Sequence, residues 1–292
     1  MPHTDSLAFM SDSQAPMFVE KLWLRPFRNV KATDLIFENI LHSQPHSFFL
    51  LGDVVNLGYS DRQWRRVDDH LQAIREKGIG LYGILGNHEV MGRPVVGESK
   101  FQQRFPDHKR AGYSIVVGGV AIVLLNSNFQ TLSDKEEREQ QDWFSQSVES
   151  FDTDPAIDYV ITCCHHSPFT NSRIVRASRE VQEKFLPIFY ESRKSQLFLS
   201  GHAHAFEHFQ VKGKDFMVIG GGGGLTQPLR RGIGSLADLA EDYKPMFHYI
   251  TITPAGDHLK LQSFHLKKDF SGFEEGLQHD IKKWMEAVKK IG

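Results

Sequence analysis

Five short polar segments, each directly after an apolar run, carry the residue types in this sequence that could do chemistry. They combine carboxylate, amide and imidazole groups in a fixed order: Asp12-Ser13-Gln14, Gly52-Asp53, Gly86-Asn87-His88-Glu89, His165-His166 and Gly201-His202-Ala203-His204. Such a mixture of oxygen and nitrogen donors suits two hard-to-borderline metal ions held side by side. One His-x-His pair would be a weak signal, but five such segments at strand ends predict a two-metal centre.

The elements that must position these segments alternate between strands and helices. Apolar runs and turn residues predict strands at 7–11, 47–51, 79–85, 113–117, 120–126, 159–164, 197–200, 206–211, 216–219, 247–253 and 259–264. Helical spacing predicts helices at 32–41, 60–77, 133–148 and 273–290. Because no repeat or linker is visible, we expect one domain over 1–292, with two packed sheets flanked by helices. Open α/β sheets place ligands at strand ends, where the polar segments fall.

Composition limits the function classes. The chain of 292 residues has a formal net charge of −2, so no overall field recruits nucleic acid or an anionic membrane. The sequence has no long uncharged apolar run and no basic-then-apolar leader, so we expect neither a transmembrane helix nor a secretory signal. The two cysteines, Cys163 and Cys164, are adjacent, which excludes a disulfide framework and favours a reducing compartment. A cytoplasmic location is therefore expected.

The ordered motifs Asp-x-Gln, Gly-Asp, Gly-Asn-His-Glu, His-His and Gly-His-x-His resemble those of the calcineurin-like metallophosphoesterases. The resemblance covers about Leu7 to Gly224 and implies an α/β fold, a four-layer α/β/β/α sandwich of two mixed sheets flanked by helices. The stretch 201–207 and the glycine run after it look most like the purple acid phosphatase branch.

The resemblance also implies a role for each polar segment. Asp53 would bridge two divalent ions, with Asp12, Gln14 and His204 completing the first site and Asn87, His165 and His202 the second. The activity implied is metal-dependent hydrolysis of a phosphomonoester or phosphodiester, in a small molecule or a phosphoprotein. A hydroxide bridging the ions would attack phosphorus, and His88 would assist the leaving group.

Two ligand choices stay open in the sequence. Neighbouring strand residues point to opposite faces, so only one of His165 and His166 should reach the metals; the pattern His165-His166-Ser167-Pro168-Phe169 favours His165. The family more often has histidine where this chain has Gln14. A glutamine carbonyl is a harder donor, which favours manganese or magnesium over iron or zinc at the first site. Alternatively, Gln14 points away and water takes its place.

Three further features of the sequence bear on the purple acid phosphatase branch and on the substrate: Asn56, a glycine run and five arginines. Asn56 stands where purple acid phosphatases have tyrosine, so the strict purple branch is disfavoured; its side chain could orient His88 or serve only a turn. The glycines at 220–224 suggest a turn near the metal rim rather than a nucleotide loop. Five arginines could grip an anionic substrate or simply be solvated: Arg173, Arg176, Arg179, Arg230 and Arg231.

A catalytically inactive binding or scaffolding module with the same fold is the alternative function. Such modules usually lose metal ligands or the catalytic histidine, whereas this chain keeps Asp53, Asn87 and His88. Substrate selectivity is expected in the loops at 91–103 and 168–179, and a closing helix is expected to pack through Ile281, Trp284, Met285 and Val288.

Overall fold

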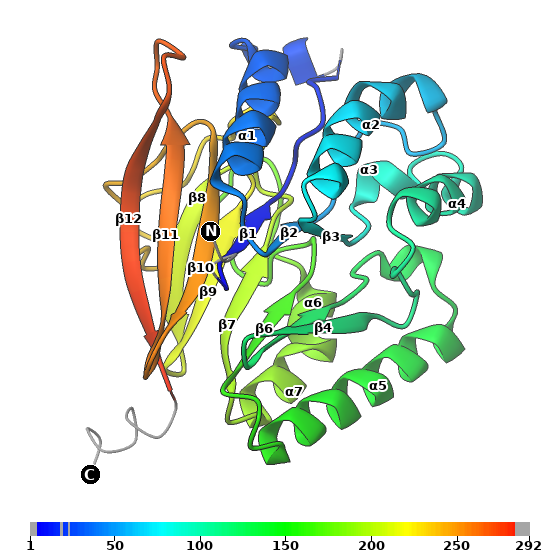
Figure 1. Cartoon of the computed structure of the whole chain (residues 1–292), viewed down its shortest axis with the longest axis vertical. Helices are drawn as coiled ribbons and strands as arrows, with labels where there is room; N and C mark the ends of the chain where they lie inside the picture. The colour runs from blue at the N-terminus through cyan, green and yellow to red at the C-terminus, as the bar shows by residue number, and fades with distance from the viewer. Residues whose placement is uncertain (1–4, 18–19, 23, 284–292) are drawn as a thin grey trace.

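The computed structural model describes residues 5–17, 20–22 and 24–283. The first of its two six-stranded sheets contains β1 (Leu7–Met10), β2 (Ser47–Leu50), β3 (Gly80–Gly83), β10 (His248–Ala255), β11 (His258–Leu266) and β12 (Phe273–Lys282). Their order is β12-β11-β10-β1-β2-β3, with β1, β2 and β3 parallel and the other pairs antiparallel (Figure 1).

The second sheet contains β4 (Tyr113–Val117), β5 (Val120–Leu124), β6 (Tyr159–Cys163), β7 (Ser195–Ser200), β8 (Phe206–Val211) and β9 (Lys214–Ile219). Its order is β4-β5-β6-β7-β9-β8. Strands β5, β6, β7 and β9 are parallel, and an antiparallel partner closes each edge. Both sheets are therefore mixed, as predicted.

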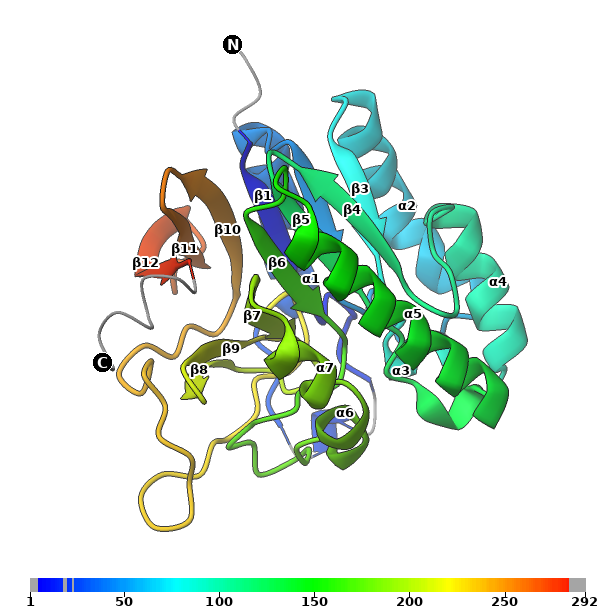
Figure 2. The same cartoon turned by 90° about the horizontal axis from the view of Figure 1, so that it is seen from below.

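The helices are α1 (Asn29–Ser43), α2 (Asp61–Glu76), α3 (Asn87–Val90), α4 (Pro94–Arg104), α5 (Asp134–Thr153), α6 (Arg179–Lys184) and α7 (Leu186–Glu191), with 3-10 turns at Glu20–Leu22 and Phe129–Thr131. Helices α1 and α2 lie on the side of the first sheet and α5–α7 on the side of the second (Figures 1 and 2). A capping box begins α5, since Ser133 Oγ accepts the Glu136 N–H.

Three apolar layers hold the sandwich together. The middle layer lies between the sheets and includes Phe9, Ile161 and Met217. The outer layers lie beneath the helices, and α2 buries one face through Trp64, Val67, Leu71 and Ile74. The four-layer α/β/β/α arrangement is therefore confirmed.

The predicted closing helix is wrong over Phe273–Lys282, which forms β12 instead. This segment pairs antiparallel with β11, and Ile281 on it is buried in the inter-sheet core. The helical spacing that suggested otherwise depended on Trp284, Met285 and Val288, which lie outside the described residues. Pairing of this segment with the edge of β11, and burial of Ile281, outweigh the helical pattern of the sequence.

The region 91–103, predicted as a loop, is mostly helix α4. A proline at the first helical position is the sequence feature that favours this helix. Packing also stabilises it, because Phe101 is fully buried between Trp64 and Phe105. Helices α6 and α7 were also not predicted; they are too short to show a clear helical period.

Candidate metal centre

The five polar segments meet at one edge of the sandwich, where the parallel strands end. Asp12 follows β1, Asp53 follows β2, and the histidine segments follow β6 and β7. Three of these residues have left-handed backbones, with φ of 60° at Asp12, 51° at Asp53 and 65° at His202. Such conformations cost about 1–3 kcal/mol each and concentrate at functional sites. The fold thus holds several donors in strained but fixed positions.

Asp53 lies at the centre of the group and is 1% exposed. Its Oδ2 is 3.2 Å from His165 Nε2, which is also 3.2 Å from Asn87 Oδ1. His165 Nδ1 donates to the Leu51 carbonyl at 2.8 Å, which fixes the ring and directs Nε2 toward Asp53. Asp53, Asn87 and His165 therefore present their donors to a common point.

A second group forms on the other side of Asp53. Donor atoms of Asp12, Asp53 and His204 lie within 4.8 Å of one another, and His204 Nε2 is 3.3 Å from Asp12 Oδ1. His204 Nδ1 donates to the Leu225 carbonyl at 2.9 Å, so this ring too is held with Nε2 facing inward.

Gln14 reaches this second group. In the amide orientation that satisfies its surroundings, Nε2 donates to the main-chain oxygens of Asp53 at 2.8 Å and Asp12 at 3.2 Å, and the amide oxygen faces His204 Nε2 at 3.3 Å. The alternative in which Gln14 points away from the centre does not describe this geometry.

The donor separations suit bound ions. Ligands held at about 2.1 Å from one ion lie roughly 3.0–3.4 Å apart. The distances from Asp53 Oδ2 to His165 Nε2 and from Asp12 Oδ1 to His204 Nε2 are 3.2 and 3.3 Å. The donor set of carboxylates, amides and imidazoles fits the two-metal chemistry that the sequence implied.

His165 and His166 both lie near the centre, but they have different neighbours. Nitrogens of His165, His166 and His202 lie within 4.8 Å of one another. Strand β6 ends at Cys163, and the alternation of strand side chains does not extend to these residues. His165 faces Asp53, whereas His166 Nδ1 is 2.9 Å from Ser127 Oγ.

The pKa values of the neighbouring residues His165 and His166 are shifted in opposite directions. Burial lowers the pKa of His165, but the Asp53 carboxylate outweighs burial and raises this pKa to about 10. Burial and the adjacent His165 charge lower the pKa of His166 to about 3. Burial would raise the pKa of Asp53, yet the surrounding histidines hold it well below the usual range. A metal ion at this site would displace the His165 proton.

Glu89, given no role from the sequence, joins two of the polar segments. This fully buried carboxylate accepts main-chain N–H groups from Gly86 at 2.7 Å, Asp53 at 2.8 Å, Val54 at 2.8 Å and Val55 at 3.1 Å. Burial and the Asp53 charge raise its pKa to about 7. Its position three residues after Gly86, at the start of α3, was the available signal.

His88 is oriented by a main-chain group. Its Nδ1 donates to the Asn56 carbonyl at 3.0 Å, its main-chain N–H donates to Asp53 Oδ1 at 2.9 Å, and Nε2 lies 3.8 Å from Asp53 Oδ2. The Asn56 side chain instead donates to the Ala15 carbonyl. The suggestion that the Asn56 side chain orients His88 is therefore wrong.

The glycine run packs against the end of β1. The Gly222 and Gly224 N–H groups donate to the Ser11 and Asp12 carbonyls, at 2.9 and 2.8 Å. A Cβ at Gly224 would lie 2.5 Å from the His204 ring, so glycine permits close approach to a candidate ligand. The glycine run therefore turns close to the candidate metal ligands, as the sequence predicted.

The candidate arginines occupy two loops that touch. Main-chain bonds run from the Arg173 N–H to the Pro228 carbonyl and from the Arg230 N–H to the Asn171 carbonyl, both near the bridge between Ser172 and Leu229. All five arginine side chains are exposed: Arg173, Arg176, Arg179, Arg230 and Arg231.

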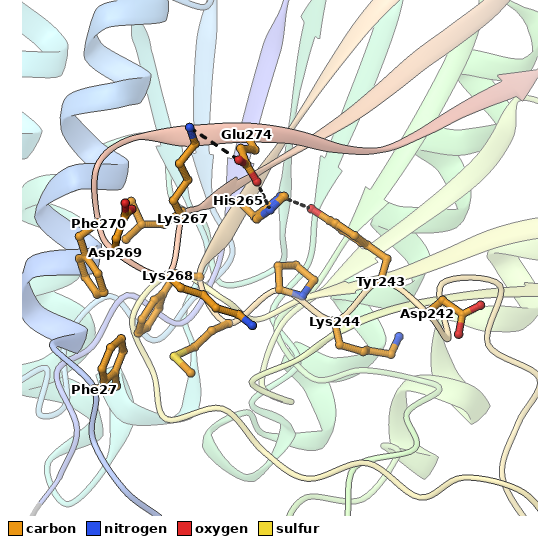
Figure 3. A pocket seen from close by; sticks show the side chains of 14 residues that line it. Phe27, Asp242, Tyr243, Lys244, His265, Lys267, Lys268, Asp269, Phe270 and Glu274 are labelled. Atoms are coloured by element: carbon orange, nitrogen blue, oxygen red, sulfur yellow. Dashed lines mark hydrogen bonds and ion pairs between the residues drawn. The ribbon is translucent and has the colours of Figure 1, made fainter.

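A pocket of about 920 Å³ lies apart from these donors (Figure 3). It is lined by the loop 242–247, the end of β11, the start of β12 and Phe27. Tyr243, His265 and Glu274 form a chain across it, with His265 Nδ1 3.1 Å from the Tyr243 hydroxyl and Nε2 3.3 Å from Glu274. Because none of the candidate metal ligands lines this pocket, the chemistry is assigned to the polar centre.

Comparison with solved structures shows the same fold in several proteins. The anchor protein GAP50 of the inner membrane complex of Plasmodium is 13% identical, with a TM-score of 0.70 over 98% of this chain and 93% of that one. Purple acid phosphatase PPD1 from yellow lupin is 15% identical, with a TM-score of 0.70 over 97% of this chain and 54% of that one. A dimetal phosphatase from Danio rerio is 13% identical, with a TM-score of 0.59 over 96% of this chain and 99% of that one.

No curated protein sequence matches significantly. The sequence profile described as calcineurin-like phosphoesterase matches residues 6–206, which include every one of the five polar segments. With this match over more than half of the chain, and with the fold and the clustered donors already described, the protein belongs to the calcineurin-like phosphoesterase family.

Proposed function

We propose that the protein is a two-metal hydrolase of phosphate esters. The observation that carries this proposal is the position of Asp53, whose buried carboxylate lies between two groups of donors. One group contains Asn87, His165 and His202, and the other contains Asp12, Gln14 and His204. A carboxylate with two oxygens can serve both groups.

Divalent ions bound there would polarise phosphoryl oxygens and would lower the pKa of a bound water toward neutrality, so that hydroxide is available near neutral pH. We propose manganese first, because Gln14 supplies oxygen where imidazole would favour iron or zinc. The residues of the chain hold this arrangement rigidly: main-chain carbonyls fix both His165 and His204, and Glu89 fixes the loop that carries Asp53.

His88 is proposed to assist the leaving group. Its Nδ1–H donates a hydrogen bond to the Asn56 carbonyl, so Nε2 is the nitrogen that can exchange a proton with a substrate. When both nitrogens are protonated, Nε2 donates to the departing oxygen, and proton transfer of this kind contributes about 10²–10⁴-fold.

The test compares His88→Ala with the parent on alkyl and nitrophenyl phosphates in the presence of manganese. The alkyl ester should lose about 10²–10⁴-fold, whereas the activated aryl ester, whose leaving oxygen is already a stable anion, should lose much less. The exposed His42, changed to alanine, is the matched control. Equal losses on both substrates would contradict proton donation and leave His88 an electrostatic role.

A non-catalytic anchoring or binding module is the second candidate. The neighbour described as an anchor in the Plasmodium inner membrane complex shares this fold over nearly the whole chain. A folded protein with two bound ions and no hydrolysis of monoesters, diesters or cyclic nucleotides would favour this candidate.

The proposed substrate is a phosphate ester of a small molecule or a phosphoprotein, and the proposed location is the cytoplasm. Cys163 and Cys164 are free buried thiols, which agrees with a reducing compartment. Among the described helices, none has the length and apolar character needed to cross a bilayer.

A further inference from the structure

Three ionisable side chains occupy the edge of the core between the two sheets. His208 lies on β8, Asp215 on β9 and His279 on β12. The residues two positions away on the same strands, Phe206, Met217 and Ile281, belong to the inter-sheet core. Because strand side chains alternate, these polar residues stand on the face that is otherwise apolar.

The three side chains converge on one point. His208 Nε2 is 2.7 Å from Asp215 Oδ1, and His279 Nε2 is 3.1 Å from the same oxygen. The two imidazole ring centroids are 4.5 Å apart. His208 is 2% exposed, whereas 27% of the His279 side chain is exposed and leaves an approach from solvent.

The cluster lies toward the opposite end of the sheets from the candidate two-metal centre. Asp215 is at the beginning of β9, which runs parallel to β7, while His202 and His204 follow the far end of β7. The two groups share no residue. Ion binding at one can therefore be measured separately from ion binding at the other.

We propose that His208, Asp215 and His279 form a third metal site, which binds a divalent ion of zinc type and links the two sheets. Two imidazoles and a carboxylate are ligands that zinc accepts, with water from the exposed side of His279 as the fourth. In tetrahedral zinc sites the ligand atoms lie about 3.3 Å apart, so the separations of 2.7 and 3.1 Å would need to widen by about 0.6 and 0.2 Å.

The surrounding charges are compatible with a cation. Burial would raise the pKa of Asp215, but hydrogen bonds from His208 and His279 lower it, so the carboxylate is ionised. Asp280 adds negative potential near His279. A bound ion would contact all three side chains at once.

The experiment counts zinc ions bound per chain after chelator treatment and readdition of zinc, for the parent and for His279→Gln. We expect the variant to bind one ion fewer. Loss of a residue that only supports a metal ligand weakens binding by up to about 100-fold, and His279 is proposed as a ligand, so the dissociation constant of that ion should rise by at least about 100-fold. His42→Gln, which changes an exposed histidine on α1, should bind as the parent does.

A second measurement uses the Asp53→Asn background, in which the two-metal centre is weakened. Zinc should raise the melting temperature of Asp53→Asn but not of Asp53→Asn combined with His279→Gln. Equal zinc counts in the parent and His279→Gln, with the same melting response in both backgrounds, would overturn the proposal and leave a metal-free hydrogen-bonded cluster. His279→Gln is chosen because its side chain is partly exposed on an edge strand.

Discussion

Replacing Gly86 by alanine should weaken both ions of the candidate centre, because the new Cβ would collide with Asp53. A Cβ at this position would overlap Asp53 Oδ1 and the Asp53 main-chain nitrogen. Neither atom belongs to the end of a long flexible side chain, so Asp53 or the loop that carries residue 86 must move. Overpacking of this kind costs about 1–3 kcal/mol.

The expected loss of metal affinity follows from that cost. If Asp53 relaxes away in the metal-free protein, binding must restore the strained position, so the same 1–3 kcal/mol is lost from binding, or about 5–150-fold. Because Asp53 is proposed to serve both ions, both dissociation constants should rise. Titration of chelator-treated protein with manganese measures them.

Two other glycines provide controls of different kinds. A Cβ at Gly224 would lie 2.5 Å from the His204 ring, so Gly224→Ala should weaken one ion only. A Cβ at Gly83 would meet the Phe105 and Phe101 rings at 3.0 and 3.2 Å, so Gly83→Ala should lower stability slightly and leave both ions unchanged. Wild-type affinity for both ions in folded Gly86→Ala would refute the reasoning.

Three further predictions concern the ligands and the pH dependence. Asp53→Asn should lower the occupancy of both ions, whereas His202→Ala should mainly lower one; metal analysis of the purified variants decides this, and full occupancy in Asp53→Asn would remove its bridging role. Gln14→His should tighten the first ion and favour zinc or iron over manganese, and an unchanged metal titration would place Gln14 outside the ligands. Burial lowers the pKa of Lys214 to about 8 from 10.5, so the folded state prefers the neutral amine. Relative to Lys214→Met, the parent should therefore gain stability as pH rises from 8 to 10.5, by at most about 1.4 kcal/mol per pH unit, and a pH-independent difference in urea unfolding would contradict this.

The sequence alone determined the family and the two-sheet fold. Apolar runs mark the strands, and polar residues such as Asp12 and Asp53 stand immediately after them. Parallel strands end at the same edge of a sheet, so local position in the chain was enough to predict that these side chains meet. Helix α2 was equally readable, because its face of Trp64 and Leu71 repeats at the helical period.

Only the tertiary structure decided the features that depend on contacts between distant segments. Phe273–Lys282 is a strand because β11 offers it an edge. The main-chain carbonyl of Asn56, rather than its side chain, holds His88. His166 joins His165 and His202 because β6 ends before it.

The cluster of His208, Asp215 and His279 was invisible in the sequence for the same reason. The first two residues are close in the chain, but His279 is far from both and comes from the other sheet. Hydrophobic period reports which face of an element is buried and says nothing about which distant element covers that face. Packing of the two sheets brings these side chains together, so only the folded chain reveals the site.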